Sequence, residues 1–176
     1  MAHTTVPPGE SPQRTRQAWS VLIVSTLAFT VCFMVWMMFG VIGIPIKKML
    51  DLNSTQFGLL MSMPVLSGSL VRVPLGIWTD KYGGRIVMAG VMAATVPAIW
   101  VMGYATEYWH FLTIGMFVGL AGGSFSVGTP YVARWFPKGR QGTAMGIYGA
   151  GNSGAAVNKF VAPVILVAFG WAAVPH

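Results

Sequence analysis

Long apolar runs alternate with short polar connections along this chain of 176 residues. A run of about 20 apolar residues is long enough to cross the roughly 30 Å hydrocarbon core of a bilayer as a helix. Five such runs are present, at residues 19–44, 57–78, 86–104, 111–133 and 143–169. The first is too long for the core of a signal peptide and lacks a small-residue cleavage pattern. The pattern therefore predicts an all-α integral membrane protein with five spanning helices.

The two ends of the chain lie outside this pattern. The first 17 residues include Pro7, Pro8 and Pro12, and we expect them to form a disordered tail. Residues 18–176 are expected to form one transmembrane domain, because the longest connection, residues 45–56, is too short to fold by itself. No sixth apolar run follows the fifth in this sequence.

Composition agrees with a membrane protein and excludes most soluble classes. Hydrophobic residues make up 55% of the chain and charged residues only 9%, whereas soluble domains carry about a quarter charged residues. The single cysteine, Cys32, lies in an apolar run, which argues against disulfides and against a thiolate metal site. No metal-ligand cluster, cofactor loop or nucleophile with a base is visible, so we expect no enzyme, cofactor or metal.

The net charge of +7 is explained by topology. In a soluble protein it would suggest nucleic-acid binding, but Lys and Arg also gather in the cytoplasmic loops of membrane proteins. The tail and the connections after the second and fourth runs carry Arg14, Arg16, Lys81, Arg85, Arg134, Lys138 and Arg140. Their acidic neighbours are only Glu10 and Asp80, whereas the opposite side is neutral. We therefore predict a cytoplasmic N-terminus and no nucleic-acid partner.

Arg72 lies inside the second apolar run. An arginine in a span costs at least ~2.5 kcal/mol of insertion free energy and usually marks a pathway or a ligand. Eight residues separate it from Asp80, roughly 12 Å of helix, which makes the alternative, snorkelling to the interface, difficult. No Asp or Glu lies in any run. A guanidinium without a resident counter-ion suits a planar oxyanion, so we predict an anionic substrate at Arg72.

Two further side chains are expected at a similar depth. Phe125 lies nine residues before Arg134, and Asn152 about eleven residues from the inner end of its helix, which correspond to roughly 13 and 16 Å of helix. We predict that both meet Arg72 near mid-membrane, although Phe125 also suits ordinary packing. Lys159 follows Asn152 by seven residues on the same helix face. It either guides anions or extends to the outer interface.

Glycines recur at helical spacing in the last two runs. Gly115, Gly119 and Gly123 repeat every fourth residue, and a second group consists of Gly142, Gly146, Gly149, Gly151 and Gly154. Small residues let helix backbones approach closely where lipid removes the hydrophobic drive for packing. We predict helix contacts at the first group. Packing alone explains the second group less well, because the polar Asn152 interrupts it.

The connection after the second run reads GIWTDKYGGR, residues 76–85, and resembles the loop signature of the major facilitator superfamily. The resemblance implies the first five helices of an N-terminal half that works by alternating access. It also implies a cytoplasmic latch formed by Gly76, Asp80, Lys81, Gly83 and Arg85. A carboxylate at a helix end can pair with an arginine or with a facing helix N-terminus and be released by rocking. A simple charged turn would explain the sign of these residues but not their spacing.

A second resemblance covers residues 122–163. The segment FPKGRQG, followed by GAGNSG at residues 149–154, is similar to the nitrate/nitrite porter branch of that superfamily. This implies nitrate or nitrite held between aromatic rings by two arginines, one from each half. By position, Arg72 is the implied first-half arginine, Phe125 the aromatic residue, and Gly151 and Asn152 parts of the glycine-rich signature. Members of the superfamily have twelve helices in two halves of six, so the resemblance also implies a domain truncated before a sixth helix. The second arginine would lie in a missing C-terminal half.

These features predict a partial secondary transporter of nitrate, nitrite or both in the bacterial cytoplasmic membrane. Its expected partners are the anion, the lipid bilayer and the missing C-terminal half. One alternative is a major-facilitator transporter of another small anion, such as a monocarboxylate, which would not explain the GAGNSG segment. The other alternative is a truncated five-helix membrane protein without transport activity.

Overall fold

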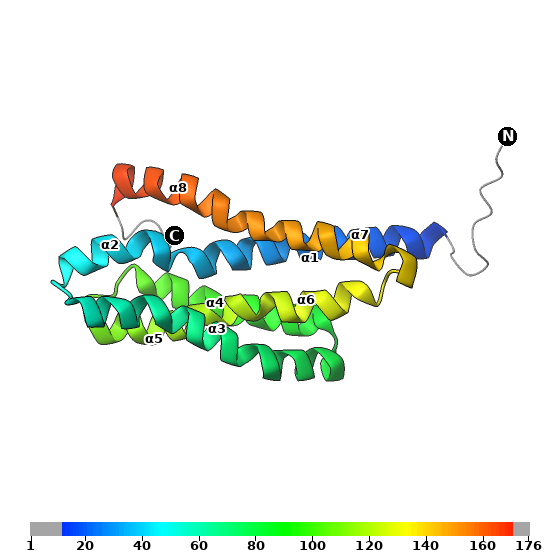
Figure 1. The fold of residues 1–176 in the computed structure, drawn as a ribbon, viewed down its shortest axis with the longest axis horizontal. Coiled ribbons are helices and arrows are strands. Elements are labelled where there is room, and N and C mark those ends of the chain that lie inside the picture. Colours follow the sequence, from blue (N-terminus) through cyan, green and yellow to red (C-terminus); the bar gives the residue numbers. More distant parts are fainter. Residues whose placement is uncertain (1–11, 171–176) are drawn as a thin grey trace.

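A computed structural model describes residues 12–170, which form α-helices and short 3₁₀ segments without a strand (Figure 1). Five stretches of this part are long and apolar enough to cross a membrane. They comprise α1 (Pro12–Met37) with α2 (Phe39–Met49); α3 (Ser54–Tyr82); α4 (Gly84–Met102); α5 (Tyr108–Val118), η1 (Gly119–Gly123) and α6 (Ser124–Ala133); and α7 (Lys138–Gly149), η2 (Ala150–Asn152) and α8 (Ser153–Phe169). The predicted all-α membrane architecture is confirmed.

The first helix begins earlier than its apolar run. The sequence predicted a disordered tail up to residue 17, but α1 starts at Pro12, so this prediction is wrong for residues 12–17. Proline is well suited to the first helical position, where its missing N–H leaves no hydrogen bond unmade. The polar residues that follow extend the helix beyond the apolar run. Pro7 and Pro8 lie outside the described residues.

The start of α3 is fixed by a reciprocal cap. The Gln56 backbone N–H donates to Asn53 Oδ1 at 2.8 Å, and the Asn53 N–H donates to Gln56 Oε1 at 3.1 Å. Both bonds satisfy N–H groups that the first turn of a helix leaves unpaired. At the other end Gly83, with φ of 87°, ends the helix. The helix therefore extends beyond the predicted apolar run, residues 57–78, in both directions.

Three of the five stretches are interrupted in the middle, which the apolar pattern does not predict. The breaks are at Met38, in η1 and in η2. The η1 segment reads Gly-Leu-Ala-Gly-Gly, and glycine is a weak helix former because it loses the most backbone entropy. The breaks in the fourth and fifth stretches therefore coincide with their glycine-rich segments.

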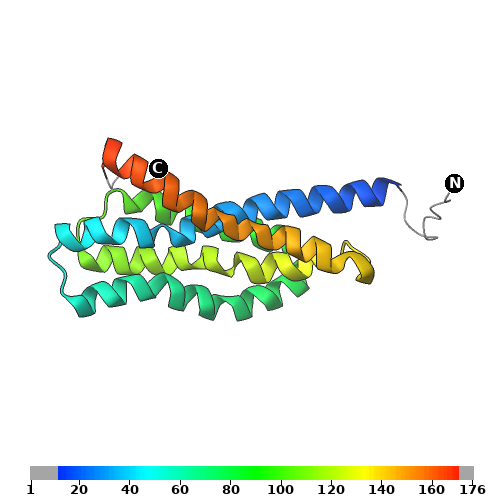
Figure 2. The same cartoon turned by 45° about the horizontal axis from the view of Figure 1, so that its top comes forward.

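The helices form an elongated bundle with nearly parallel axes (Figure 1). The stretches α1–α2 and α7–α8 lie side by side, and α3, α4, α5 and α6 form the other part. Figure 2 shows that α7–α8 crosses α1 obliquely. Helices α1 and α7 begin at the end of the bundle where α3 and α6 finish. The connections with the predicted cytoplasmic charges therefore gather at one end.

Close backbone contacts at glycines join the neighbouring stretches. A Cβ atom at Gly119 would lie 2.7 Å from the Pro64 carbonyl oxygen, and one at Gly68 would lie 2.9 Å from the Gly119 oxygen. Gly154 lies against α1, where a Cβ atom would overlap the carbonyl oxygen of Thr30. These separations are too short for any side chain, so glycine is required for α3 to meet η1 and for α8 to meet α1.

Other glycines of the fifth stretch lie next to open space. A Cβ atom at Gly142, Gly146 or Gly149 would meet no other atom within 4 Å. The predicted second glycine group therefore divides into two parts. Gly151 and Gly154 pack against α1, and the other three leave a face of α7 uncovered.

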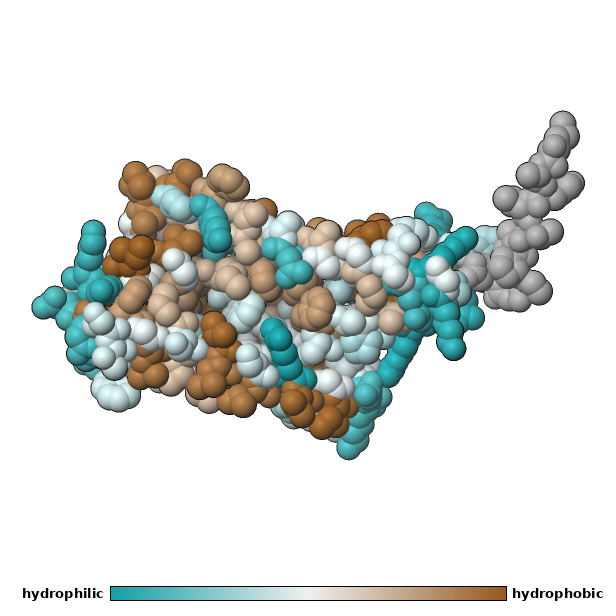
Figure 3. Space-filling model, viewed as in Figure 1, coloured by the Kyte–Doolittle hydropathy of each residue, from teal (hydrophilic) through white to brown (hydrophobic). Residues whose placement is uncertain are grey.

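The visible face is mostly apolar or intermediate along the length of the bundle, with isolated hydrophilic side chains, and hydrophilic residues gather at both ends (Figure 3). Large apolar side chains are exposed, among them Val167 with 87% and Phe160 with 79% of their surface accessible. Such a surface is unfavourable in water but is matched by the hydrocarbon chains of lipid. The exposed apolar belt therefore agrees with a membrane location.

We expect Gly154→Ala to destabilise the chain and Gly146→Ala to leave it as stable or more stable. The new methyl group would overlap the α1 backbone in the first variant, and overpacking typically costs about 1–3 kcal/mol. In the second it meets open space, and alanine is the better helix former. Thermal unfolding of both variants in detergent checks this difference. Equal melting temperatures would contradict the close packing of α8 on α1.

Candidate functional site

Arg72 lies on α3, and its side chain is exposed. Within residues 12–170 no carboxylate pairs with its guanidinium, because the ion pair found there joins two other residues. The Arg72 backbone oxygen accepts a long hydrogen bond of 3.5 Å from Ser126 Oγ. That contact places the start of α6 beside Arg72. Phe125, the neighbour of Ser126 in the sequence, is therefore close to Arg72 along the bundle.

Phe125 is part of a cluster of aromatic rings from three helices. Its ring centroid lies 5.5 Å from that of Phe29 on α1 and 6.0 Å from that of Tyr148 on α7. Phe29 and Tyr148 stack on each other at 5.0 Å, with 23° between their planes. Phe125 is 41% exposed, so the cluster supports part of this ring and the rest remains open.

The glycine-rich signature lies next to the same cluster. Gly151 is buried against Phe29, and a Cβ atom there would overlap that ring. Asn152 follows in η2 with an exposed side chain whose Nδ2 donates to the Gly149 carbonyl oxygen at 2.8 Å. Phe29 therefore contacts both Phe125 and the signature. Through Phe29, the structure brings α6 and η2 to one level of the bundle.

Lys159 is exposed on α8, beyond this level. Neither Lys159 nor Asn152 is hydrogen-bonded to Arg72 in the described part of the chain. The structure thus places Phe125 and Gly151 against the same ring, Phe29, with the Arg72 backbone beside the start of α6. The polar ends of Asn152 and Lys159 are exposed. The described helices provide one open side of a site and do not enclose an anion.

A groove of about 790 Å³ lies elsewhere, between α1, α4 and α6. Arg16 and Arg85 line it together with apolar residues such as Met88 and Met92, but Arg72 and Asn152 do not. Volume alone would favour this groove as a ligand site. The buried aromatic contacts and the unpaired arginine instead favour the open face near Phe125.

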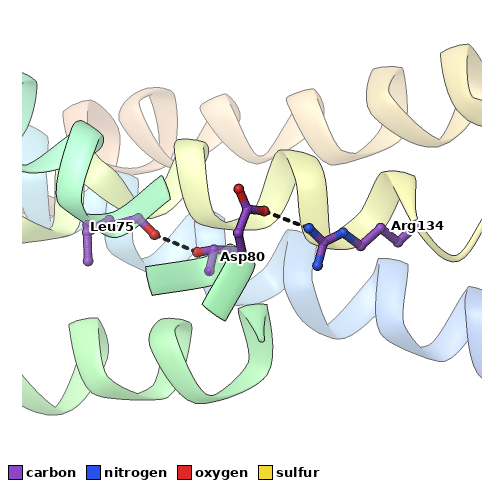
Figure 4. Close-up of polar contacts among 4 residues, drawn as sticks. Leu75, Asp80 and Arg134 are labelled. Carbon is purple, nitrogen blue, oxygen red and sulfur yellow. Dashed lines mark hydrogen bonds and ion pairs between the residues drawn. The ribbon is translucent and has the colours of Figure 1, made fainter. Parts of the chain in front are cut away.

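The predicted latch residues gather at the end of α3. Asp80 forms an ion pair with Arg134, the Arg134 Nη2 to Asp80 Oδ1 distance being 2.6 Å (Figure 4). Its partner is thus not Arg85, which lines the groove described above. Lys81 Nζ lies 5.3 Å from the centroid of the Tyr82 ring. The ion pair joins the end of α3 to the end of α6.

The other two latch residues are glycines. A Cβ atom at Gly76 would meet nothing within 4 Å, so this position is free for a close approach from outside the described helices. Gly83 has a φ of 87°, which side chains rarely adopt, and it allows the sharp turn from α3 into α4. The turn between α3 and α4 therefore explains why the motif has a glycine at position 83.

Sequence reasoning missed three residues that shape this region: Phe29, Tyr148 and Arg134. Phe29 and Tyr148 stand among many aromatic residues, and no local pattern indicates which rings meet. Arg134 was counted among the topological charges, and it lies 54 positions from Asp80. Its place at the end of an apolar run, on the same side as Asp80, was the available signal.

The chain is similar in sequence to one protein family and to several named proteins. The model of the Major Facilitator Superfamily matches residues 24–175. The chain is 43% identical over 157 residues to the probable nitrate/nitrite antiporter NarK1 of Thermus thermophilus, covering 89% of this chain and 34% of that protein. It is 35% identical over 151 residues to the nitrite extrusion protein of Bacillus subtilis, covering 85% and 38%.

A third relative is the probable nitrate transporter NarT of Staphylococcus carnosus, with 35% identity over 150 residues, 85% of this chain and 39% of that protein. The chain therefore spans between 34% and 39% of the length of these curated relatives. The expected similarity to nitrate and nitrite porters is confirmed at the level of these matches.

We expect Asp80→Asn and Arg134→Gln to destabilise the chain by less in combination than the sum of the two single effects. Each single variant removes the same ion pair, which is more than half exposed on both sides (55% for Arg134 and 67% for Asp80). Exposed pairs contribute about 0.2–1 kcal/mol. Unfolding of the two single variants and the double variant gives the coupling energy. Strictly additive effects would contradict the pairing.

Proposed function

This chain belongs to the Major Facilitator Superfamily, and from that membership we propose that it forms part of a secondary transporter for nitrate, nitrite or both. The transporter acts by alternating access in the bacterial cytoplasmic membrane, with the N-terminus of the chain on the cytoplasmic side. The names of the three relatives support the substrate class. The gathering of basic connections at one end of the bundle supports the orientation.

One observation carries the proposal: the Arg72 side chain is exposed and pairs with no carboxylate within residues 12–170, and its backbone lies beside the start of α6, which carries Phe125. The planar fork of N–H donors fits two oxygens of a planar oxyanion at once. A resident carboxylate would compete with the substrate, but none pairs with Arg72 within residues 12–170. Arg72 therefore binds the anion, and its charge offsets the cost of bringing the anion into the membrane.

The remaining site residues have supporting roles in this proposal. Phe125 bounds the anion on the α6 side, and the Asn152 amide orients it through a hydrogen bond once it leaves the Gly149 oxygen. Gly151 makes room for Phe29 and so keeps η2 close to the site. Lys159, farther along α8, attracts anions toward the path.

We also propose that Gly76, Asp80, Lys81, Gly83 and Arg85 belong to a latch that favours one conformation of the transporter. The support is the Asp80–Arg134 ion pair, which ties two helix ends on one side of the bundle, and the open surface at Gly76, where another helix can approach. Rocking against a second bundle would bring other partners to these residues. That bundle is the remaining part of the transporter, corresponding to the rest of the relatives' length.

We expect Arg72→Lys to reduce nitrate transport at least about tenfold, because lysine cannot form the two parallel hydrogen bonds of a guanidinium and a charged bond contributes ~1.5–3 kcal/mol. The measurement is uptake of labelled nitrate into proteoliposomes that contain the gene product carrying this sequence. Arg140→Lys is the matched control, since Arg140 is exposed near the start of α7.

Unchanged transport by the Arg72→Lys variant would exclude Arg72 as the binding residue. Competition with unlabelled nitrite, acetate or formate in the same vesicles then tests the substrate class. Inhibition by acetate and formate as strong as that by nitrate would favour a monocarboxylate transporter instead, because carboxylates fit the same guanidinium fork.

A further inference from the structure

Tyr148 belongs to the aromatic cluster and is fully buried, with 0% of its surface accessible. Its ring stacks on Phe29 at 5.0 Å and on Phe125 at 6.0 Å, with 23° and 29° between the planes. Tyr148 therefore contacts both the Phe125 ring of α6 and the Phe29 ring of α1. No motif in the sequence assigned a role to this residue.

The phenol group of Tyr148 contacts α6 at two residues, Ser124 and Gly128. Tyr148 Oη donates a 3.0 Å hydrogen bond to the Ser124 carbonyl oxygen, in the residue that precedes Phe125. A Cβ atom at Gly128 would overlap that same phenol oxygen. The absence of a side chain at Gly128 is thus what lets the phenol reach Ser124. The bond fixes the Tyr148 ring relative to the backbone that carries Phe125.

The orientation of Phe125 matters for an anion because an aromatic ring has a negative face and a positive edge. A ring that turns freely would present its repulsive face as often as its attractive edge. Tyr148 covers part of one face of Phe125 and limits the directions in which the ring can turn. Tyr148 is buried and does not reach the open surface, but it fixes the angle at which the Phe125 ring faces the anion.

We propose that Tyr148 is a positioning residue for the anion site, which fixes the Phe125 ring through the stack and through its hydrogen bond to Ser124. This inference rests on the proposed function. Plain packing of α7 against α1 and α6 would require the same buried ring. The two roles differ in what a substitution changes: packing alters the amount and stability of folded protein, whereas positioning alters the affinity for the anion.

The first test is Tyr148→Phe, which keeps the stacked ring and removes the hydroxyl. The KM for nitrate is measured in proteoliposomes, with the maximal rate normalised to the amount of folded protein. Interhelical hydrogen bonds in membranes contribute modestly, so we expect KM to rise roughly threefold with little change in maximal rate. Tyr148→Leu removes both stacked contacts as well, and KM is expected to rise by about tenfold.

Tyr108→Phe is the matched control. Tyr108 Oη also donates to a backbone carbonyl oxygen, that of Gln56 at 3.1 Å, and is part-buried. It begins α5, at the opposite end of the bundle from the Asp80–Arg134 pair. Loss of its hydroxyl should lower the melting temperature to a similar extent and leave KM unchanged. An equal rise of KM in Tyr108→Phe and Tyr148→Phe, or no rise in either, would overturn the positioning role.

A second measurement asks whether Tyr148 acts through Phe125. In a Phe125→Leu background there is no ring to orient, so Tyr148→Phe should no longer raise KM. A rise as large as that in the unaltered background would overturn the inference and leave the proposed function intact. If the unaltered protein transports no nitrate, the proposed function fails first, and this inference fails with it.

Discussion

The fold depends on close contact between helix backbones, which in lipid replaces the hydrophobic drive that packs soluble helices. Gly68 and Gly119 bring α3 against η1, and Gly154 brings α8 against α1. These two contacts connect helices that are distant in the sequence. They also bring Phe125 and Gly151 against the same ring, Phe29, and place the start of α6 beside the Arg72 backbone. The position of the candidate site is therefore a consequence of where glycine permits backbones to meet.

Other glycines of the bundle lie next to open space and not against another helix. Gly76 on α3 and Gly142, Gly146 and Gly149 on α7 have no neighbour that a methyl group would touch. Arg72 and Asn152 are exposed on the same two stretches. A bundle that needed only its own packing would gain helix stability from alanine at such positions. Glycine there is consistent with surfaces that approach another part of a transporter.

Sequence reasoning predicted the fold well, and it named candidate site residues that stay predictions. Apolar runs give the number and order of the spans, because lipid imposes a fixed length on each helix. They do not give the start at Pro12 or the break at Met38, which depend on polar residues and local hydrogen bonds. Arg72 was identifiable because a charge in an apolar run is exceptional.

The aromatic support could not be predicted, because the chain has nine other phenylalanines and five tyrosines, and the sequence does not show which of them contact Phe125. Which rings stack is decided by helix crossing and by the register of α7 on α1. The partner of Asp80 was hidden for the same reason, since Arg134 reaches it only after α3 and α6 pack together. Local patterns therefore indicate candidate chemistry, and tertiary contacts decide which candidates cooperate.

The placement of charge explains why such a site would release its ligand as well as bind it. An arginine in a span costs at least ~2.5 kcal/mol unless water or an anion compensates it. All four acidic residues of this chain lie outside the apolar runs, and Asp80 is already engaged by Arg134 at the bundle end. No carboxylate of these helices can therefore neutralise Arg72 permanently. Among the described helices, only a mobile anion or water on the open face is left to compensate this charge, and the anion and the water can replace each other when the face opens to a different side of the membrane.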